Sequence, residues 1–253
     1  MLRLIVIGLL LATSLSASAR DLDAILDSGI LRVGTTGDYK PFTYLDEGAY
    51  EGFDIDMAEH VAEEMGLDVE FVETSWPTLM DDLKADKYDI GMGGISRTVS
   101  RQLQARYSHP YLTYGKTPLV HVDNADRFSS LEDIDQPDVR IGVNPGGTNE
   151  AFVKDNIQQA EVVVIERNLD IPPAVAAKEV DVMITDSPEA IFYANADEDL
   201  AAPLVDEPFT KSQLAYLMQA DAERLQGTVN FILERMELTG ELDALRREHL
   251  LIQ

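Results

Sequence analysis

The sequence predicts an α/β protein made of two lobes with a cleft between them. Strand and helix patterns alternate along the chain, which is typical of βαβ units and a mostly parallel sheet. The alternation occurs in two similar blocks, which are joined by extended segments and followed by a helical tail. A chain of 253 residues, 45% of them hydrophobic, is long enough to give each lobe its own core.

The first block contains three predicted strands with helices between them. Ala58, Val61, Ala62 and Met65 recur at the i, i+3, i+4, i+7 spacing of an amphipathic helix, and Gly66 ends it. The predicted order is a strand over 31–36, this helix, a strand over 68–74, a helix from 76 through 83, and a buried strand over 89–92.

The second block repeats this alternation and leads into the tail. Val229, Ile232, Leu233 and Met236 have helical spacing in the tail. The predicted elements are strands over 140–143 and 161–166, helices over 150–156 and around 174–177, a strand ending at Thr185 with a helix after it, a strand over 215–218, and a helix over 222–249 interrupted near Gly240.

Residues 1–19 have the pattern of an export signal. Arg3 supplies a positive charge, an apolar run follows over 4–15, and Ala17-Ser18-Ala19 matches a cleavage site. The run is shorter than the roughly 20 apolar residues that a membrane-spanning helix needs. We therefore expect cleavage after Ala19, a periplasmic location, and no membrane insertion of the mature chain.

The composition argues against several kinds of site. The chain has no cysteine, so thiol catalysis and disulfides are excluded, and its four histidines lack the spacing of a metal site. A site made of carboxylates alone stays open. The formal charge of −26 opposes binding to nucleic acid or anionic membranes, because both need basic patches. We expect no metal, no cofactor and no nucleic-acid partner, and a small molecule as the ligand.

Two carboxylates three residues apart stand where a buried strand becomes a helix. The strand ends at Asp186, and Ser187-Pro188 predicts a helix start with Ser187 as the N-cap. Open α/β sheets bind ligands beyond the carboxyl ends of their strands, so Asp186 and Glu189 are candidate site residues. Close to Asp186 in a dehydrated cleft, Glu189 would have a raised pKa and serve as a general acid. The alternative for Glu189, a surface acid favoured by the helix dipole, stays open.

Arg101 is the candidate for holding a carboxylate. It follows a Gly93-Gly94 turn at a strand end, and Thr98 predicts a helix cap that places Arg101 in the first helical turn. The helix dipole disfavours a cation there unless an anion accompanies it, and a bidentate carboxylate fits that position. Gly94, with a free N–H, and Ser96 are expected to lie at the same site. An exposed arginine paired with a surface acid is the open alternative.

Two further loops carry candidate ligand contacts. A glycine-rich turn that begins at Asn144 and contains Thr148 leads into a helix, so its N–H groups suit an anion, although a plain strand-to-helix turn is the alternative. The turn lacks the lysine of a phosphate-binding loop. Tyr39 and Trp76 follow predicted strands and are placed to enclose a ring. For Phe42, a third aromatic of this kind, packing over a strand end is the favoured interpretation.

Segments along the whole mature chain resemble one family. They are Leu31–Phe42, Gly52–Asp56, Asp89–Ser96, Arg101 and Tyr107–Tyr111. These segments resemble the periplasmic solute-binding proteins, family 3, of polar amino-acid uptake. The resemblance implies an α/β, two-lobe periplasmic-binding-protein fold of type II (venus flytrap) with two hinge strands, at about 117–122 and 214–218. It also implies that Arg101 holds the ligand carboxylate, that Asp186 holds the amino group, and that an ABC permease is a partner.

The resemblance divides the chain into a signal peptide and two lobes. The signal peptide is 1–19, lobe 1 is 20–117 with 218–253, and lobe 2 is 118–217.

Within that family, longer motifs are similar to those of cyclohexadienyl dehydratases. Those enzymes convert prephenate to phenylpyruvate, or arogenate to phenylalanine. The similarity implies that Glu189 is the general acid and that Tyr39, Trp76 and Asn144 lie in the cleft. The motifs are Thr35–Phe42, Thr74–Pro77, Ile134–Pro137 and Val143–Glu150.

One position departs from the dehydratase pattern. Leu214 stands where that pattern has a lysine, and Lys40 and Arg97 are the candidates to replace it. Two interpretations therefore stay open. In the first, the protein is a dehydratase that acts on prephenate or arogenate in the cleft between the lobes. In the second, it is a non-catalytic receptor that binds an amino acid for an ABC uptake system.

Overall fold

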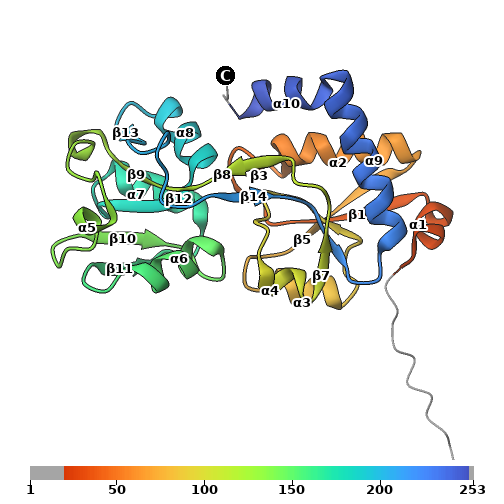
Figure 1. Cartoon of the computed structure of the whole chain (residues 1–253), viewed down its shortest axis with the longest axis horizontal. Coiled ribbons are helices and arrows are strands. Elements are labelled where there is room, and N and C mark those ends of the chain that lie inside the picture. Colours follow the sequence, from red (N-terminus) through yellow and green to blue (C-terminus); the bar gives the residue numbers. More distant parts are fainter. Residues whose placement is uncertain (1–19, 251–253) are drawn as a thin grey trace, which may run out of the picture.

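The computed structural model describes residues 20–250, which form two lobes joined by a two-stranded sheet (Figure 1). Each lobe contains a five-stranded sheet with helices packed on it, so the predicted α/β class and the two-lobe architecture are confirmed. Across 20–250, none of the helices combines the length and the apolar character that a bilayer span requires. The expected export signal at 1–19 lies outside the described residues.

Lobe 1 is built on a sheet with the strand order β5-β1-β6-β15-β7. β1 runs parallel to β5 and β6, as the strand–helix alternation predicts, while β15 is antiparallel to β6 and β7. Before the first crossing to lobe 2, the elements are α1 (Leu22–Ser28), β1 (Ile30–Thr35), β2 (Asp38–Tyr39), β3 (Thr43–Asp46), β4 (Ala49–Glu51), α2 (Phe53–Met65), β5 (Asp68–Glu73), α3 (Leu79–Lys84), β6 (Ile90–Gly91), α4 (Val99–Gln102) and β7 (Ala105–Tyr107).

Lobe 2 is built on a second sheet, with the order β11-β10-β12-β9-β13. β10 is parallel to β11 and β12, and β9 runs antiparallel to β12 and β13. Its elements are β9 (Lys116–His121), the 3-10 helix Val122–Asn124, α5 (Leu131–Ile134), β10 (Arg140–Val143), α6 (Thr148–Asn156), β11 (Glu161–Val164), the 3-10 helix Asn168–Asp170, α7 (Ile171–Ala176), β12 (Val182–Asp186), α8 (Ser187–Ala196) and β13 (Leu200–Ala201).

The lobes are connected by β8 (Leu112–Tyr114) and β14 (Ser212–Leu214), which pair antiparallel (Figure 1). The hinge positions implied by the resemblance are therefore wrong, except that the second begins at Leu214, the last residue of β14. The segment expected at 117–122 belongs almost wholly to β9, which is buried along its full length and pairs with β12 inside lobe 2. β15 (Leu217–Gln219) belongs to the lobe 1 sheet. The hinge strands are short and partly polar (Leu-Thr-Tyr and Ser-Gln-Leu), so a prediction based on apolar extended segments selected β9 and β15 instead.

The helical tail returns the chain to lobe 1. It forms α9 (Glu223–Thr239) and α10 (Glu241–His249), separated at Gly240 as predicted, and both helices contact α2 (Figure 1). The predicted apolar stripe of α9 is confirmed, since all four of its residues are buried in the core that lobe 1 forms around α2 and β1. Lobe 1 is thus assembled from both ends of the chain, with lobe 2 inserted between them.

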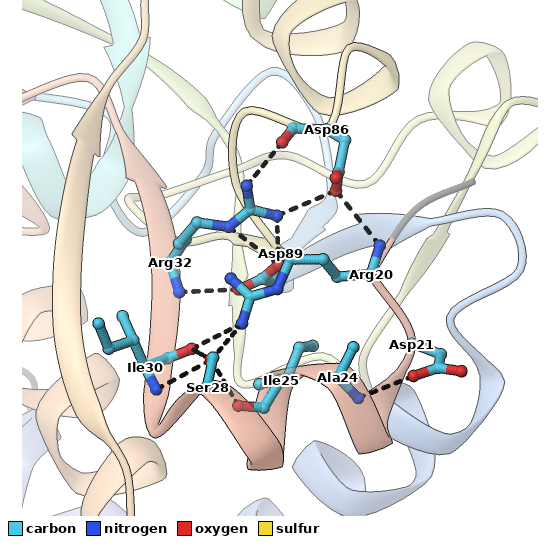
Figure 2. Close-up of polar contacts among 9 residues, drawn as sticks. All are labelled: Arg20, Asp21, Ala24, Ile25, Ser28, Ile30, Arg32, Asp86 and Asp89. Carbon is cyan, nitrogen blue, oxygen red and sulfur yellow. Dashed lines mark hydrogen bonds and ion pairs between the residues drawn. The ribbon is translucent and has the colours of Figure 1, made fainter. Parts of the chain in front are cut away.

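Ion pairs hold the amino-terminal ends of the central strands in both lobes. In lobe 1, Arg32 of β1 donates from its backbone N (2.9 Å) and from Nη2 (2.7 Å) to the fully buried carboxylate of Asp89, next to β6 (Figure 2). Nη2 of Arg32 also bonds to Asp86, and Arg20 forms a second ion pair with Asp89. In lobe 2, Arg140 of β10 binds Asp181, next to β12, through its backbone N (2.9 Å) and Nε (3.0 Å). The two sheets therefore use the same device at equivalent positions.

The middle of β1 depends on a residue without a side chain. A Cβ on Gly34 would lie 2.4 Å from Cδ1 of Tyr88, a fully buried ring packed across the strand. Gly142 of β10 has the corresponding place in lobe 2, where a Cβ would lie 2.9 Å from Ile171. These glycines let a ring or a branched side chain pack directly on the backbone.

Two alanine substitutions are expected to change stability in opposite directions. Gly34→Ala should lower the free energy of unfolding by about 1–3 kcal/mol, because it overpacks the core against Tyr88. Gly227→Ala is the matched control: Gly227 is exposed in α9, and no atom lies within 4 Å of the place that a Cβ would take, so a better helix former should raise stability by about 0.5–1 kcal/mol. Urea denaturation at neutral pH measures both. Equal stabilities would contradict the packing described for Tyr88.

Candidate ligand-binding and catalytic site

The eight predicted binding residues all line one small cavity between the lobes, with a volume of about 20 Å³. Lobe 1 contributes five of them and lobe 2 three, so the cavity exists only where the lobes meet. The lobe 1 residues are Tyr39, Trp76, Gly94, Ser96 and Arg101; the lobe 2 residues are Asn144, Thr148 and Asp186. Gly147, Asn149 and Asn168 complete the lining.

Asp186 ends β12 and is almost fully buried. One carboxylate oxygen accepts from the hydroxyl of Tyr39 in lobe 1, and the other pairs with Nζ of Lys116 in lobe 2, at 2.5 Å. The expected helix cap at Ser187 is wrong. Asp186 itself is the N-cap residue, and its side chain makes no capping bond because both oxygens are taken. Ser187 is the first residue of α8, and its backbone N–H donates to the carbonyl of Gly115.

Arg101 lies in the first turn of α4, as predicted, and Thr98 caps that turn by accepting from the Arg101 backbone N–H at 3.2 Å. The side chain is only 9% exposed, and Nη1 donates to the Ser96 carbonyl at 3.1 Å. Arg101 forms no ion pair with any residue in the described part of the chain, so the surface ion pair considered as an alternative is absent there. Its charge is left available to an anion in the cavity.

The Gly93-Gly94 turn differs from the expectation. The N–H of Gly94 does not point at a ligand, because it donates to the buried carboxylate of Asp54 at 2.5 Å. Tyr111 and Tyr216 donate to the same carboxylate. Gly94 is needed instead for space: it has a φ of +67°, and a Cβ would lie 2.3 Å from the Tyr39 ring. The turn thus positions Tyr39 against the cavity.

The aromatic residues divide as expected. The rings of Tyr39 and Trp76 meet edge to face with their centroids 5.7 Å apart, and both rings line the cavity. The indole N–H of Trp76 donates to Asp38 at 3.0 Å. Phe42 is fully buried beneath Tyr39 and Phe53, so its predicted packing role is confirmed. Burial, with the charges of Asp186 and Glu189, raises the pKa of Tyr39 well above its usual range, which keeps its hydroxyl a donor.

Glu189 is fully buried in the first turn of α8, so the surface alternative is wrong. It lies directly behind the cavity wall: Oε1 accepts from Nδ2 of Asn168 at 2.6 Å, and Oε2 accepts from the hydroxyl of Thr185. Burial raises the pKa of Glu189 to about 8; those two hydrogen bonds oppose the rise, and the charges of Asp186 and Asp38 add to it. Glu189 therefore carries a proton at neutral pH.

Position 214, where the dehydratase pattern has a lysine, is apolar here, and a lysine lies beside the cavity at position 116 instead. Leu214 is fully buried in the core of lobe 1, Lys40 lies over the Tyr44 ring, and Arg97 bonds to Gln213, so neither proposed replacement reaches the cavity. Lys116 instead contacts three residues of the cavity wall. The sequence signal was slight: one lysine at the start of a strand that continues Thr-Pro-Leu-Val-His.

Asn149, Asn168 and Thr185 were also missed, because their roles depend on tertiary contacts. Asn149 accepts from Lys116 and donates to Thr185 at 3.2 Å, which links the lysine to the residue that bonds Glu189. Asn168 donates to Glu189 and, across the lobe boundary, to the carbonyl of Asp38 at 3.2 Å. Thr185 is four residues before Glu189, so spacing relates those two, but no spacing in the sequence brings Asn149 and Asn168 to them.

Known proteins with similar sequences include an enzyme and several binding proteins. The chain is 44% identical to cyclohexadienyl dehydratase of Pseudomonas aeruginosa over 244 residues, which are 96% of this chain and 90% of that protein. It is 24% identical to the L-cystine-binding protein TcyJ of Escherichia coli over 226 residues, 88% of this chain and 84% of the other.

The solved structures that match also include both a binding protein and a dehydratase. An ancestral amino acid-binding protein, described as a precursor of cyclohexadienyl dehydratase, matches with a TM-score of 0.84 and 38% identity over 90% of this chain and 98% of its own. An ancestral cyclohexadienyl dehydratase matches with a TM-score of 0.58 and 51% identity, over 93% and 98%. Sequence identity and TM-score thus rank these two in opposite orders.

The family assignment agrees with the fold and with these relatives. The family model of the bacterial extracellular solute-binding proteins, family 3, matches residues 31–251, nearly all of the mature chain predicted from the sequence. The type II architecture and the interlobe cavity are those expected of such a protein. The chain belongs to the bacterial extracellular solute-binding proteins, family 3.

Proposed function

We propose that the protein is a cyclohexadienyl dehydratase, which converts prephenate to phenylpyruvate, or arogenate to phenylalanine, in the cavity between its lobes. The observation that carries the proposal is Glu189, a fully buried carboxyl group with its pKa raised to about 8 directly behind the cavity wall. A receptor that only binds has no need of a protonated acid there, whereas a dehydratase needs one. The 44% identity to the Pseudomonas aeruginosa enzyme supports the same conclusion.

Substrate binding is assigned to the groups around the cavity. Arg101, buried and without an acidic partner among the described residues, holds a substrate carboxylate. Tyr39 and Trp76 flank the ring. Asn144, Ser96 and Thr148 supply hydrogen bonds, and Gly94 leaves room for Tyr39.

The reaction needs one proton and a defined position. Glu189 donates its proton to the departing C4 hydroxyl, which leaves as water. The ring carboxylate leaves as CO2, and its bonding electrons complete the aromatic ring. Glu189 then regains a proton from solvent. Aromatisation provides the driving force, so positioning and one general acid suffice.

Substrate entry requires the lobes to separate. The cavity of about 20 Å³ is far smaller than the 300 Å³ or more of typical ligand pockets. Asn168 bonds to Glu189 in its own lobe and to Asp38 in the other, so separation of the lobes breaks its second contact. Without the bond to Asp38, Asn168 can move aside, so that the substrate can contact Glu189.

The location and partner follow from the export pattern and the family. Cleavage after Ala19 would place the enzyme in the periplasm.

The alternative, a receptor that passes an amino acid to an ABC permease, is supported by relatives such as TcyJ and by the higher TM-score of the ancestral amino acid-binding protein. Turnover of prephenate separates the two, because only the enzyme releases phenylpyruvate.

Glu189→Gln should abolish most of the activity. The amide keeps the size and the hydrogen bonds of the side chain but has no acidic proton, so kcat for prephenate should fall about 10²–10⁴-fold while KM changes little. Phenylpyruvate formation, corrected for the rate without protein, measures this. Glu198→Gln, at an exposed acid of the same lobe, is the control and should keep full activity. A wild-type protein with no rate above background would overturn the proposal in favour of the receptor.

The pH dependence of activity should follow the same group. Because Glu189 must be protonated, kcat should fall about tenfold per pH unit once the pH exceeds 8. A rate that stays level to pH 10 would exclude Glu189 as the acid.

Stability should depend on pH with a definite sign. Folding raises the pKa of Glu189 from 4.5 to about 8, so its contribution to stability is full below pH 4.5 and is lost as the pH rises through 8. Relative to Glu189→Gln, the wild type should lose on the order of 4 kcal/mol of unfolding free energy between about pH 4 and pH 8. Urea denaturation of both proteins at each pH gives the difference; parallel curves would contradict the pKa shift.

A further inference from the structure

The side-chain ammonium of Lys116 has all of its hydrogen-bond partners within the protein. Lys116 lies on β9 directly opposite Asp186 of β12 in the antiparallel pairing, and both side chains are about 95% buried. Its Nζ is 2.5 Å from Asp186 and 3.0 Å from the hydroxyl of Thr148, and it also bonds to the side-chain amide oxygen (Oδ1) of Asn149. An ammonium group has three N–H donors, and here each has one acceptor. The geometry needs no further partner.

The acceptors around this lysine are those that an amino group in the cavity would need. Asp186, Thr148 and Asn149 all line the cavity. The second oxygen of Asp186 is also taken, by the hydroxyl of Tyr39, so the carboxylate has no oxygen left without a donor. A ligand ammonium at Asp186 would have to share a carboxylate oxygen with a donor that is already bound, so it would compete with Lys116 and Tyr39 for Asp186.

The lysine also sets the charge that a ligand meets. Lys116 neutralises Asp186, and Glu189 is protonated at neutral pH, so neither acid opposes an anion there. Arg101 then remains a cation of the cavity wall without an acidic partner among the described residues. Such a cavity suits a ligand with carboxylates and no ammonium group.

We propose that Lys116 determines specificity: its side-chain ammonium occupies, on Asp186, the place that the ammonium of an amino acid would take, and it thereby favours dicarboxylates with a 2-oxo group over amino acids. The inference rests on the proposed function for its substrates, prephenate and arogenate, which differ in having an oxo or an ammonium group beside one carboxylate. Removal of the lysine ammonium exposes Asp186 to the ligand and should shift the preference toward arogenate.

The test compares both substrates in matched variants. Lys116→Met removes the charge and keeps the length of the chain; Lys116→Arg keeps the charge. For Lys116→Met, the ratio of kcat/KM for arogenate to that for prephenate should rise by about tenfold or more, because the exposed Asp186 attracts an ammonium and repels the second anion. In Lys116→Arg, the ratio should stay near that of the wild type.

The double variant Lys116→Met/Asp186→Asn guards against misfolding. It removes both charges of the buried pair, so no uncompensated carboxylate remains in the interior. Because Asp186 is gone, the gain for arogenate seen in the single variant should disappear. If the single variant fails to fold, a tenfold rise of the same ratio in the double variant, which has no carboxylate at 186 to bind the ammonium of arogenate, would contradict the inference. A wild-type-like ratio in the double variant would support it.

A binding measurement separates this inference from the proposed function. In the Glu189→Gln background, calorimetry gives Kd values for prephenate and for L-phenylalanine, with and without Lys116→Met. Tighter binding of L-phenylalanine and weaker binding of prephenate after loss of the lysine support the inference, whether or not the wild type is an enzyme. Unchanged Kd values and an unchanged ratio, in a wild type that turns over prephenate, overturn the inference and leave the proposed function standing.

Discussion

The buried carboxylate of Asp186 links the two lobes in their closed arrangement. Its partners come from both: Tyr39 from lobe 1 and Lys116 from lobe 2. A carboxylate removed from water is tolerated only when it is paired and hydrogen-bonded. Lys116 is on the neighbouring strand of the same sheet, so this pair persists when the lobes part, whereas the bond to Tyr39 is lost. The contact with Tyr39 therefore stabilises the closed state, whereas the contact with Lys116 sets the charge of the site in both states.

Two acids at one strand-to-helix junction end in different states because of their neighbours. Asp186 has a lysine within bonding distance and forms an ion pair with it. Glu189, one helical turn later, is buried among neutral donors, no cation within 20–250 contributes to its pKa, and that pKa rises to about 8. Different environments for two nearby carboxyl groups allow a single site to have both a binding group and an acid. On this fold, a binding site can therefore gain a general acid through a change in the neighbours of one carboxyl group.

Local sequence patterns were enough for the elements and for much of the cavity. The apolar spacing of α9, the cap at Thr98 and the loop positions of Tyr39 and Trp76 are properties of short segments, and the structure places the eight predicted binding residues around one cavity. What the patterns missed depends on contacts between distant segments. The N–H of Gly94 is taken by Asp54, 40 residues earlier, and Lys116 meets Asp186 across 70 residues. The strands that cross between the lobes are short and partly polar, whereas the apolar extended segment lies inside a lobe, so the hinge was misplaced.

The paired clamps Arg32–Asp89 and Arg140–Asp181 stand at the amino-terminal ends of their sheets, while the cavity lies beyond the carboxyl ends. Each lobe is thereby anchored at the edge that does no chemistry. Side chains on the opposite rim are then free to be exchanged during evolution without loosening the scaffold. A family that mostly carries nutrients could in this way give rise to a catalyst through a few rim substitutions, and the same separation makes the cavity a practical starting point for redesign toward other carboxylic acids.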